Sequence, residues 1–318
     1  MPILETLKKL YQLSEKDFVA IQQDIIDIYA YTVSAIRNPT VIILGGQPGA
    51  GKTELEKEAR LELFDNVVTC NADLFRDFHP DASLIRSKHS EYYPEITSDY
   101  AQRWNRGLRD HCEKHKLNYI LETTFSSGEL MNETIESLKS MGYVVEIKLL
   151  AVHPKLSFLG TQLRYEHMIA IEGSGRAVSI AAHEERFVNI PNTLAMVQQA
   201  GLYDELCIYG RNVASGQNSL THGIQVLERN PKNPLAVFRA EIEKEWPHKM
   251  VVYFEQILEE LLDIKIQRKC GSEEIKDITA SLERKIPLSW PETDKDISIE
   301  IKKVKGREYP ERGTGLGL

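Results

Sequence analysis

The sequence predicts an α/β fold: a mainly parallel sheet with helices on both faces, followed by a C-terminal helical appendix. Short apolar runs alternate with stretches of helical periodicity as far as Tyr209, which is the pattern of βαβ units. Beyond residue 212 the chain turns polar, and two longer amphipathic stretches then follow. The length of 318 residues leaves room for a large α/β domain and a smaller second unit.

The first helix is expected to begin near Ser14, because the segment from Ser14 to Asp17 has the residue types of a helix N-terminus. Apolar residues then recur at helical spacing until Asn38-Pro39 interrupts the pattern. The apolar run at 41–44 is the first predicted strand. This strand leads directly into a glycine-rich loop.

The glycine-rich loop matches the pattern of a phosphate-binding loop. Its residues are Gly46, Gln47, Pro48, Gly49, Ala50, Gly51, Lys52 and Thr53, and a helical stretch at 54–64 follows. In such a loop, backbone N–H groups surround a polyphosphate, a lysine supplies a mobile cation, and a hydroxyl binds Mg²⁺. A chance turn is the alternative, but the strand before and the helix after favour nucleotide binding, with Mg²⁺ at Thr53.

Four further apolar runs, at 67–70, 119–121, 144–152 and 206–209, complete the predicted sheet. Ligands of such sheets bind at the carboxyl ends of the strands. The residues that follow the runs are therefore candidates for the site, and they are Asp73, Glu122 to Thr124, and His153-Pro154.

The appendix is expected to begin with a polar linker at 212–221. Two amphipathic helices follow at 234–246 and 250–268. The second helix has an apolar face formed by Val251, Phe254, Ile257, Leu258, Leu261 and Leu262. We therefore divide the chain into a phosphate-binding domain at 1–211, the helical appendix at 212–290 and a mobile tail at 291–318.

Composition narrows the classes of partner. The formal net charge of −8 argues against non-specific binding of nucleic acid, which favours an excess of lysine and arginine. No apolar run is long enough to span a bilayer, and no signal segment is recognised. The four cysteines have no paired spacing. We expect a cytoplasmic protein that engages neither nucleic acid nor membrane.

Asp73 is the candidate general base. In phosphoryl transfer to an alcohol, a carboxylate at the carboxyl edge of the sheet accepts the hydroxyl proton and holds the nucleophile in line. The alternative is a helix N-cap, because an aspartate before Leu-Phe-Arg also suits that position. The two roles are compatible.

Glu122, Arg164 and Arg176 complete the candidate site. Glu122 could contact the hydration shell of Mg²⁺ or a sugar hydroxyl, although an ordinary loop capped by Thr123 and Thr124 is the alternative. Arg164 lies on an expected helix, and Arg176 follows a Gly-Ser-Gly segment that can bend over a ligand. Guanidinium groups stabilise charge on a transferring phosphoryl group, but exposed arginines are usually only solvated.

Together these motifs resemble the zeta toxin kinases of bacteria. The resemblance runs from about residue 15 to 210, and it adds to the loop the motifs Asp73-x-Phe-Arg-x-x-His79-Pro80, Glu122-x-Thr124, Gly142-Tyr143, Leu163-Arg164-Tyr165-Glu166 and Arg176-Ala177. It implies a P-loop kinase that transfers a phosphoryl group from ATP or GTP, with Mg²⁺, to the 3′-hydroxyl of the amino sugar of UDP-N-acetylglucosamine. The product blocks peptidoglycan synthesis. A small helical antitoxin that covers the nucleotide site is also implied.

The resemblance further implies a role for each matching residue. Lys52 and Thr53 would serve the phosphates and Mg²⁺, Asp73 would be the base, and Arg164 and Arg176 would stabilise the transferring phosphate. The residues implied for the amino sugar are Glu91, Glu122, Thr124 and Thr134. The segment between Asp73 and Thr97 does not match the family cleanly, and the appendix is longer than the kinase needs.

Two other functions remain open. One is a P-loop phosphotransferase for another hydroxyl compound, such as a different nucleotide sugar, a nucleoside or an antibiotic. The other is a regulatory nucleotide-binding module that transfers no phosphoryl group, which would not need Asp73 poised beside a hydroxyl.

Overall fold

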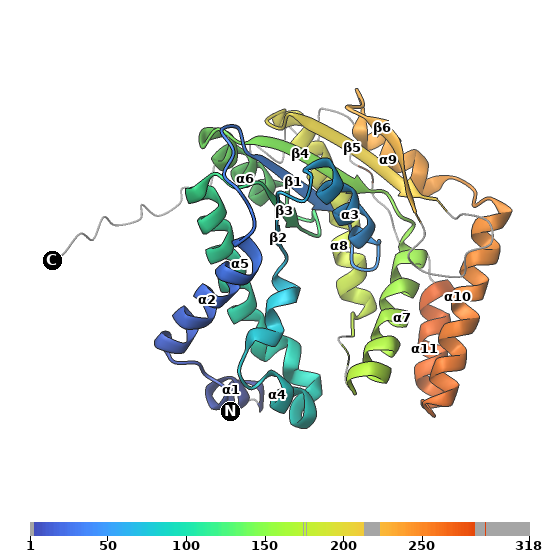
Figure 1. The fold of residues 1–318 in the computed structure, drawn as a ribbon. Coiled ribbons are helices and arrows are strands. Elements are labelled where there is room, and N and C mark those ends of the chain that lie inside the picture. Colours follow the sequence, from blue (N-terminus) through green and yellow to red (C-terminus); the bar gives the residue numbers. More distant parts are fainter. Residues whose placement is uncertain (1–2, 174, 176, 213–222, 284–289, 291–318) are drawn as a thin grey trace, which may run out of the picture.

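A six-stranded sheet forms the centre of the molecule (Figure 1). The computed structural model describes residues 3–173, 175, 177–212, 223–283 and 290. The strands are β1 (Thr40–Gly45), β2 (Val68–Cys70), β3 (Tyr119–Glu122), β4 (Val144–Leu150), β5 (Glu205–Arg211) and β6 (Ile224–Arg229), in the spatial order β2-β3-β1-β4-β5-β6. Strands β1 to β5 are parallel, and β6 is antiparallel to β5. The predicted α/β class is confirmed.

Helices cover both faces of this sheet. They are α1 (Ile3–Leu10), α2 (Glu15–Ala30), α3 (Lys52–Glu62), α4 (Ala82–His89), α5 (Tyr93–His115), α6 (Gly128–Ser140), α7 (Pro154–Glu172), α8 (Ile180–Ala200), α9 (Pro234–Glu243), α10 (His248–Gln267) and α11 (Ser272–Glu283). Two short 3₁₀ helices, η1 (Ala72–Phe78) and η2 (Ser90–Tyr92), lie between β2 and α5. No helix among the described residues has the length and apolarity needed to cross a bilayer.

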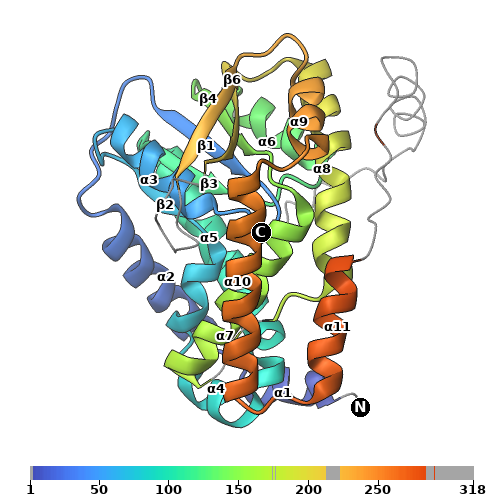
Figure 2. The ribbon, with the colours of Figure 1, turned by 90° about the vertical axis from the view of Figure 1, so that its right-hand side faces the viewer.

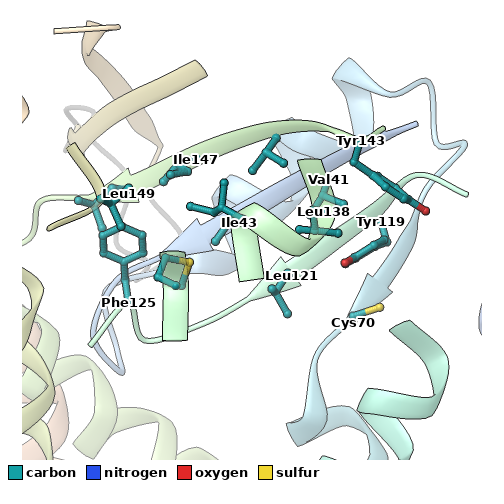
Figure 3. Packing of buried hydrophobic residues seen from close by; sticks show 14 of the residues in the cluster. Val41, Ile43, Cys70, Tyr119, Leu121, Phe125, Leu138, Tyr143, Ile147 and Leu149 are labelled. Atoms are coloured by element: carbon teal, nitrogen blue, oxygen red, sulfur yellow. The ribbon is translucent and has the colours of Figure 1, made fainter. Parts of the chain in front are cut away.

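The core has two layers because side chains alternate between the faces of a strand. Val41 and Ile43 of β1 enter the layer covered by α2, α5, α6, α8 and α9, and Figure 3 shows them packed beside Leu121 and Ile147. Ile42 and Leu44 enter the other layer, against α3, α7, α10 and α11. These four side chains of β1 are all buried, which accounts for the continuous apolar run in the sequence.

The first long helix begins as predicted but ends earlier. The side chain of Ser14 accepts a hydrogen bond from Asp17 N at 3.1 Å, so the serine is the N-cap of α2. The helix ends at Ala30, not near Asn38. Ile36 N donates to Lys116 O beyond the end of α5 at 3.0 Å, and this contact holds the chain in a non-helical connection to β1.

The prediction that the sheet ends near Tyr209 is wrong. Strand β5 continues to Arg211, and β6 pairs with it at the edge of the sheet. None of the six side chains of β6 is fully buried, so the strand lacks the apolar run by which the inner strands were recognised. A boundary at residue 211 therefore passes through one sheet, and the division into domains stays a prediction.

The helical appendix packs against the rest of the chain. Figure 2 shows α10 in front of α7, and α11 on the far side of α10. Ile257 and Leu261 of α10 are buried in the same apolar cluster as Leu159 and Leu163 of α7, whereas the predicted contact residue Val251 is exposed. The apolar face of α10 is completed by Met250 and Tyr253. The predicted tail at 291–318 and most of the predicted linker lie outside the described residues.

Candidate active site

A cleft of about 680 Å³ lies at the carboxyl ends of the strands. Its walls come from the loop after β1, the start of η1, the residues after β3 and helices α5, α7 and α8. The chain segments that meet there follow three neighbouring strands, β2, β3 and β1. This is the position at which parallel α/β sheets bind ligands.

The glycine-rich loop has the strained backbone that a phosphate cradle needs. Gly49 has φ of +75° and Gly51 has φ of +94°, a region that side chains disfavour. A Cβ atom on Gly49 would also lie 2.0 Å from the carbonyl oxygen of Ser157 in α7. The loop therefore packs tightly against α7, and helix α3 begins at Lys52 with its N-terminus at the cleft.

The predicted loop residues divide into two groups. Pro48, Gly49, Gly51, Lys52 and Thr53 line the cleft. Gln47 is fully buried instead, and its Nε2 donates to Val152 O at 2.7 Å and to Ser157 Oγ at 3.0 Å. Ala50 is also buried, and the carbonyl of Gly46 accepts a hydrogen bond from Lys52.

Lys52 lies folded back on its own loop. Its Nζ donates to Gly46 O at 2.8 Å and is 3.7 Å from the carboxylate of Glu122. Burial lowers the pKa of Lys52, and the negative charge of Glu122 opposes this shift. Within the described part of the chain, the partners of the ammonium are loop carbonyls and the carboxylate of Glu122, and phosphate oxygens could replace the carbonyls.

Asp73 faces the cleft from the first turn of η1. The cap of this short helix is Asn71, whose Oδ1 accepts a hydrogen bond from Asp73 N at 2.9 Å. Asp73 is therefore not the N-cap of η1, and its carboxylate does not serve as the cap. Its Oδ1 accepts a hydrogen bond from Arg76 Nε at 3.2 Å, and its side chain is 47% exposed.

Arg76 is a site residue whose role the sequence did not predict. It is buried, and its Nη1 donates to Pro94 O at 2.6 Å and to Thr97 Oγ1 at 3.2 Å. These bonds fix η1 to α5 and orient the carboxylate of Asp73. The three-residue spacing from Asp73 was the available signal, because such pairs meet on a helix surface.

Glu122 joins the segments that follow β2 and β1. Its Oε2 accepts a hydrogen bond from Asn71 Nδ2 at 2.8 Å, while its Oε1 faces Lys52. Thr124 also lines the cleft, and its hydroxyl is 2.8 Å from Ser126 Oγ. Both predicted residues are thus brought beside the phosphate loop.

Arg164 lines the cleft from α7, where its side chain is exposed. Its positive charge contributes to the lowered pKa of Lys52, and both residues line the cleft. Arg176 lies outside the described residues. An arginine of α8, Arg186, lines the same cleft and was not predicted.

Two predicted sugar-binding residues do not line the cleft. Glu91 is exposed in η2, before α5 begins. Thr134 lies on α6, where its hydroxyl donates to Leu130 O at 2.7 Å. Their assignment to the acceptor stays a prediction.

Helix α5 supplies polar residues to the cleft that sequence reasoning missed. Ser98, Gln102 and Asn105 recur at helical spacing and line the cleft. Asn105 is only 8% exposed, and its Oδ1 has no hydrogen-bond partner among the described residues. The signal was a polar stripe beside the buried positions Ala101 and Leu108 of this helix.

Among the described residues, the cleft contains no cluster of three potential metal ligands. The group that does occur, Glu166, Cys270 and Glu274, lies between α7, α10 and α11. Both of its carboxylates accept hydrogen bonds from Lys265 and Arg268, so their charge is already neutralised. This cluster is an ion-pair network that joins three helices.

The sheet is mainly parallel, and a phosphate loop joins β1 to α3. Acidic and basic side chains converge on Lys52 of this loop. These features define a P-loop kinase fold. The profile of the zeta toxin family matches residues 23–222, and the chain belongs to this family.

Relatives in the family are kinase-like toxins of bacteria. The chain is 28% identical over 197 residues to Toxin PezT of Streptococcus pneumoniae serotype 4, covering 60% of this chain and 78% of the relative. It is 26% identical over 215 residues to Toxin zeta of Streptococcus pyogenes, covering 67% and 75% respectively.

The fold also matches a solved structure of the PezAT chromosomal toxin–antitoxin system of Streptococcus pneumoniae. The TM-score is 0.66 at 22% sequence identity, and the match covers 80% of this chain and 98% of the other. At this identity the likeness concerns the fold alone.

Proposed function

We propose that this protein is a toxin kinase that uses ATP to phosphorylate the 3′-hydroxyl of the amino sugar of UDP-N-acetylglucosamine. The observation that carries the proposal is the convergence of Lys52, Asp73, Glu122 and Arg164 on one cleft beside a phosphate loop. Membership of the zeta toxin family supports the kinase class. The acceptor rests on the family resemblance.

The loop and α3 would bind the donor phosphates. The N-terminus of α3 lies at the cleft, where backbone N–H groups would bind phosphate, and Lys52 Nζ can leave Gly46 O to contact the β- and γ-phosphates. The hydroxyl of Thr53 fits Mg²⁺, which prefers hydroxyl, carboxylate and water ligands, and Glu122 could contact the hydration shell of the ion. When bound, the ion would neutralise charge on the phosphates.

Asp73 would accept the proton of the acceptor hydroxyl. Its carboxylate is half-exposed to the cleft while Arg76 fixes its orientation, which is the arrangement a positioned base requires. Arg164, and Arg176 by resemblance, would meet the charge that develops on the transferring group. In this scheme the acceptor enters from the side of β2 and β3.

The α5 side of the cleft suits an acceptor rich in hydroxyl and amide groups. The buried Oδ1 of Asn105 is an acceptor that the described protein leaves without a donor, and such groups are costly unless a ligand or water satisfies them. Gln102 and Ser98 add polar groups on the same helix. A sugar with hydroxyl and N-acetyl groups offers the matching donors.

An antitoxin is the proposed protein partner. The solved relative belongs to a toxin–antitoxin system, and the resemblance implies a small helical protein over the nucleotide site. Ile171 of α7 is 84% exposed and lines the cleft, so an apolar contact for such a partner is present at the site.

Incubation with ATP, Mg²⁺ and UDP-N-acetylglucosamine tests the proposal, with ADP and the phosphorylated sugar nucleotide followed by mass spectrometry. Lys52→Ala should abolish both products. The matched control is Lys57→Ala, because Lys57 lies on the same helix and is 60% exposed. ADP without a phosphorylated sugar would indicate an ATPase, and phosphorylation only of another hydroxyl compound would change the acceptor.

A further inference from the structure

Arg211, the last residue of β5, places its guanidinium against the phosphate loop. A Cβ atom built on Gly51 would lie 2.1 Å from Nη2 and 2.5 Å from Cζ of Arg211. The guanidinium therefore lies directly over the Cα atom of Gly51, where only glycine leaves room for it. Arg211 also lines the cleft, although it belongs to none of the motifs that predicted the site.

Arg211 remains charged beside the phosphate loop. Burial lowers the pKa of Arg211, while Tyr253 of α10 and Glu54 of α3 oppose the shift. An arginine remains protonated at neutral pH even so. Tyr253 is 6% exposed and shares an apolar cluster with Leu55 of α3, so the C-terminal helices help to form the site of this cation.

The position of Arg211 in the sheet separates it from the proposed base Asp73 and from Glu122. Asp73 follows β2 and Glu122 ends β3, whereas Arg211 ends β5, on the other side of β1. In phosphate loops the lysine reaches the β- and γ-phosphates, and the loop backbone holds the α- and β-phosphates. A cation over the backbone of Gly51, away from Asp73, is therefore placed for the phosphates that stay with the nucleoside.

We infer that Arg211 binds the non-transferred phosphates of the donor nucleotide, opposite the loop N–H groups. The inference rests on the proposed function, because it presumes a nucleoside triphosphate in the cleft. A guanidinium suits this role, since its planar fork can donate to two phosphate oxygens at once. Arg211 is thus a donor-binding residue, and it takes no part in proton transfer from the acceptor.

Calorimetric titration of the full chain with ATP and with ADP, each with Mg²⁺, tests the inference. Arg211→Ala should raise the Kd of both nucleotides by the same factor, about 10- to 100-fold, because the phosphates it contacts are common to both. Arg211→Lys should recover part of the loss. The control is Arg229→Ala on the neighbouring strand β6, an arginine that is 52% exposed and paired with Glu205, and it should change Kd by less than about twofold.

The outcomes separate the inference from the proposed function. Unchanged Kd values for Arg211→Ala, or a loss for ATP alone, would overturn the inference, the second by moving Arg211 to the γ-phosphate. If Arg211→Ala does not fold, Arg211→Lys decides, because it keeps the charge and should still weaken ADP by at least about threefold; unchanged ADP binding would overturn the inference. A wild-type chain that binds neither nucleotide would instead count against the proposed function.

Discussion

Three polar side chains in and just before η1 have separate structural roles. Asn71 caps the helix and also donates to Glu122, Asp73 presents its carboxylate to the cleft, and Arg76 orients that carboxylate. Because Asn71 is the N-cap, a change at Asp73 can remove the proposed base without removing the cap. The roles can therefore be tested separately.

Asp73→Asn should retain the fold and ATP binding while turnover falls by about 10² to 10⁴, the usual contribution of a positioned base. The control is Asp77→Asn, because Asp77 lies on the same helix but pairs with Arg86 at 2.7 Å. Steady-state kinetics and thermal unfolding of both variants give the comparison. Turnover within tenfold of wild type, or a loss of stability equal to the loss of activity, would contradict the assignment.

His183 of α8 supports the phosphate loop from behind. Its Nε2 lies 2.9 Å from Ser157 Oγ, which also accepts a hydrogen bond from Gln47. Burial lowers the pKa of His183 from 6.5 to about 4, so the folded protein holds a neutral imidazole. The unfolded chain binds a proton below about pH 6.5, and stability therefore decreases as the pH falls from 6.5 to about 4.

Preferential protonation of His183 in the unfolded chain should lower the free energy of unfolding by about 3 kcal/mol at the acid end of this range. Urea unfolding of wild type and His183→Gln at pH 7.5 and at pH 4.5 measures it, because glutamine does not titrate. The difference in unfolding free energy between the two proteins should shrink or reverse at pH 4.5. The same difference at both pH values would show that His183 does not titrate as described.

At the scale of elements, α7 connects the active site to the C-terminal helices. Arg164 faces the cleft, while Glu166, two residues further on, is buried against α10 and α11. The Glu166 carboxylate accepts hydrogen bonds from Lys265 Nζ at 2.5 Å and from Arg268 Nε at 2.8 Å. The N-terminal part of α7 also packs on Gly49 of the phosphate loop. Any shift of α7 would therefore move an arginine and the loop together.

Glu166→Gln should destabilise the protein by about 2 to 3 kcal/mol, because the buried Lys265 and the partly exposed Arg268 each lose one of two carboxylate partners and keep only Glu274. We also expect kcat to fall more than KM for ATP rises, since Arg164 would lose its fixed position. Denaturant unfolding and kinetics against the exposed control Glu255→Gln measure both effects. A stability loss with unchanged kcat would confine the network to a structural role.

The sequence predicted those elements whose residues are contiguous or follow a short repeat along the chain. The strand β1, the phosphate loop and α3 are contiguous, so their residues predict one another. No side chain of the edge strand β6 is fully buried, so the strand has no apolar run that would predict it. Asn105 and Arg211 join the site only through the packing of α5 and the pairing of β5, which no spacing along the chain records. Glu91 was predicted from the family resemblance, which is weak between Asp73 and Thr97, and it does not line the cleft.

At the scale of the whole molecule, the C-terminal elements belong to the core. Phe238 and Ile242 of α9 lie in the apolar layer that α8 also covers. Ile257 and Leu261 of α10 lie in the opposite layer with α7 and α3. The appendix therefore contributes to both faces of the sheet, and β6 extends the sheet itself. The appendix could stabilise the kinase domain, inhibit it in cis or dock a partner, and this packing favours the stabilising role.

Two truncations test this view through solubility, kinase rate and bacterial growth. A chain ending at Gly210 loses β6, α9, α10 and α11, and a chain ending at Lys244 loses only α10 and α11. Both should be insoluble or unfolded, because each exposes apolar surface of the core, including Leu159 and Leu163 in the second case. A chain ending at Trp290 keeps every described element and is the control, which should stay soluble. A soluble truncated chain with a higher kinase rate and greater toxicity would establish inhibition in cis. A soluble truncated chain with an unchanged kinase rate would leave docking of a partner as the role of α10 and α11.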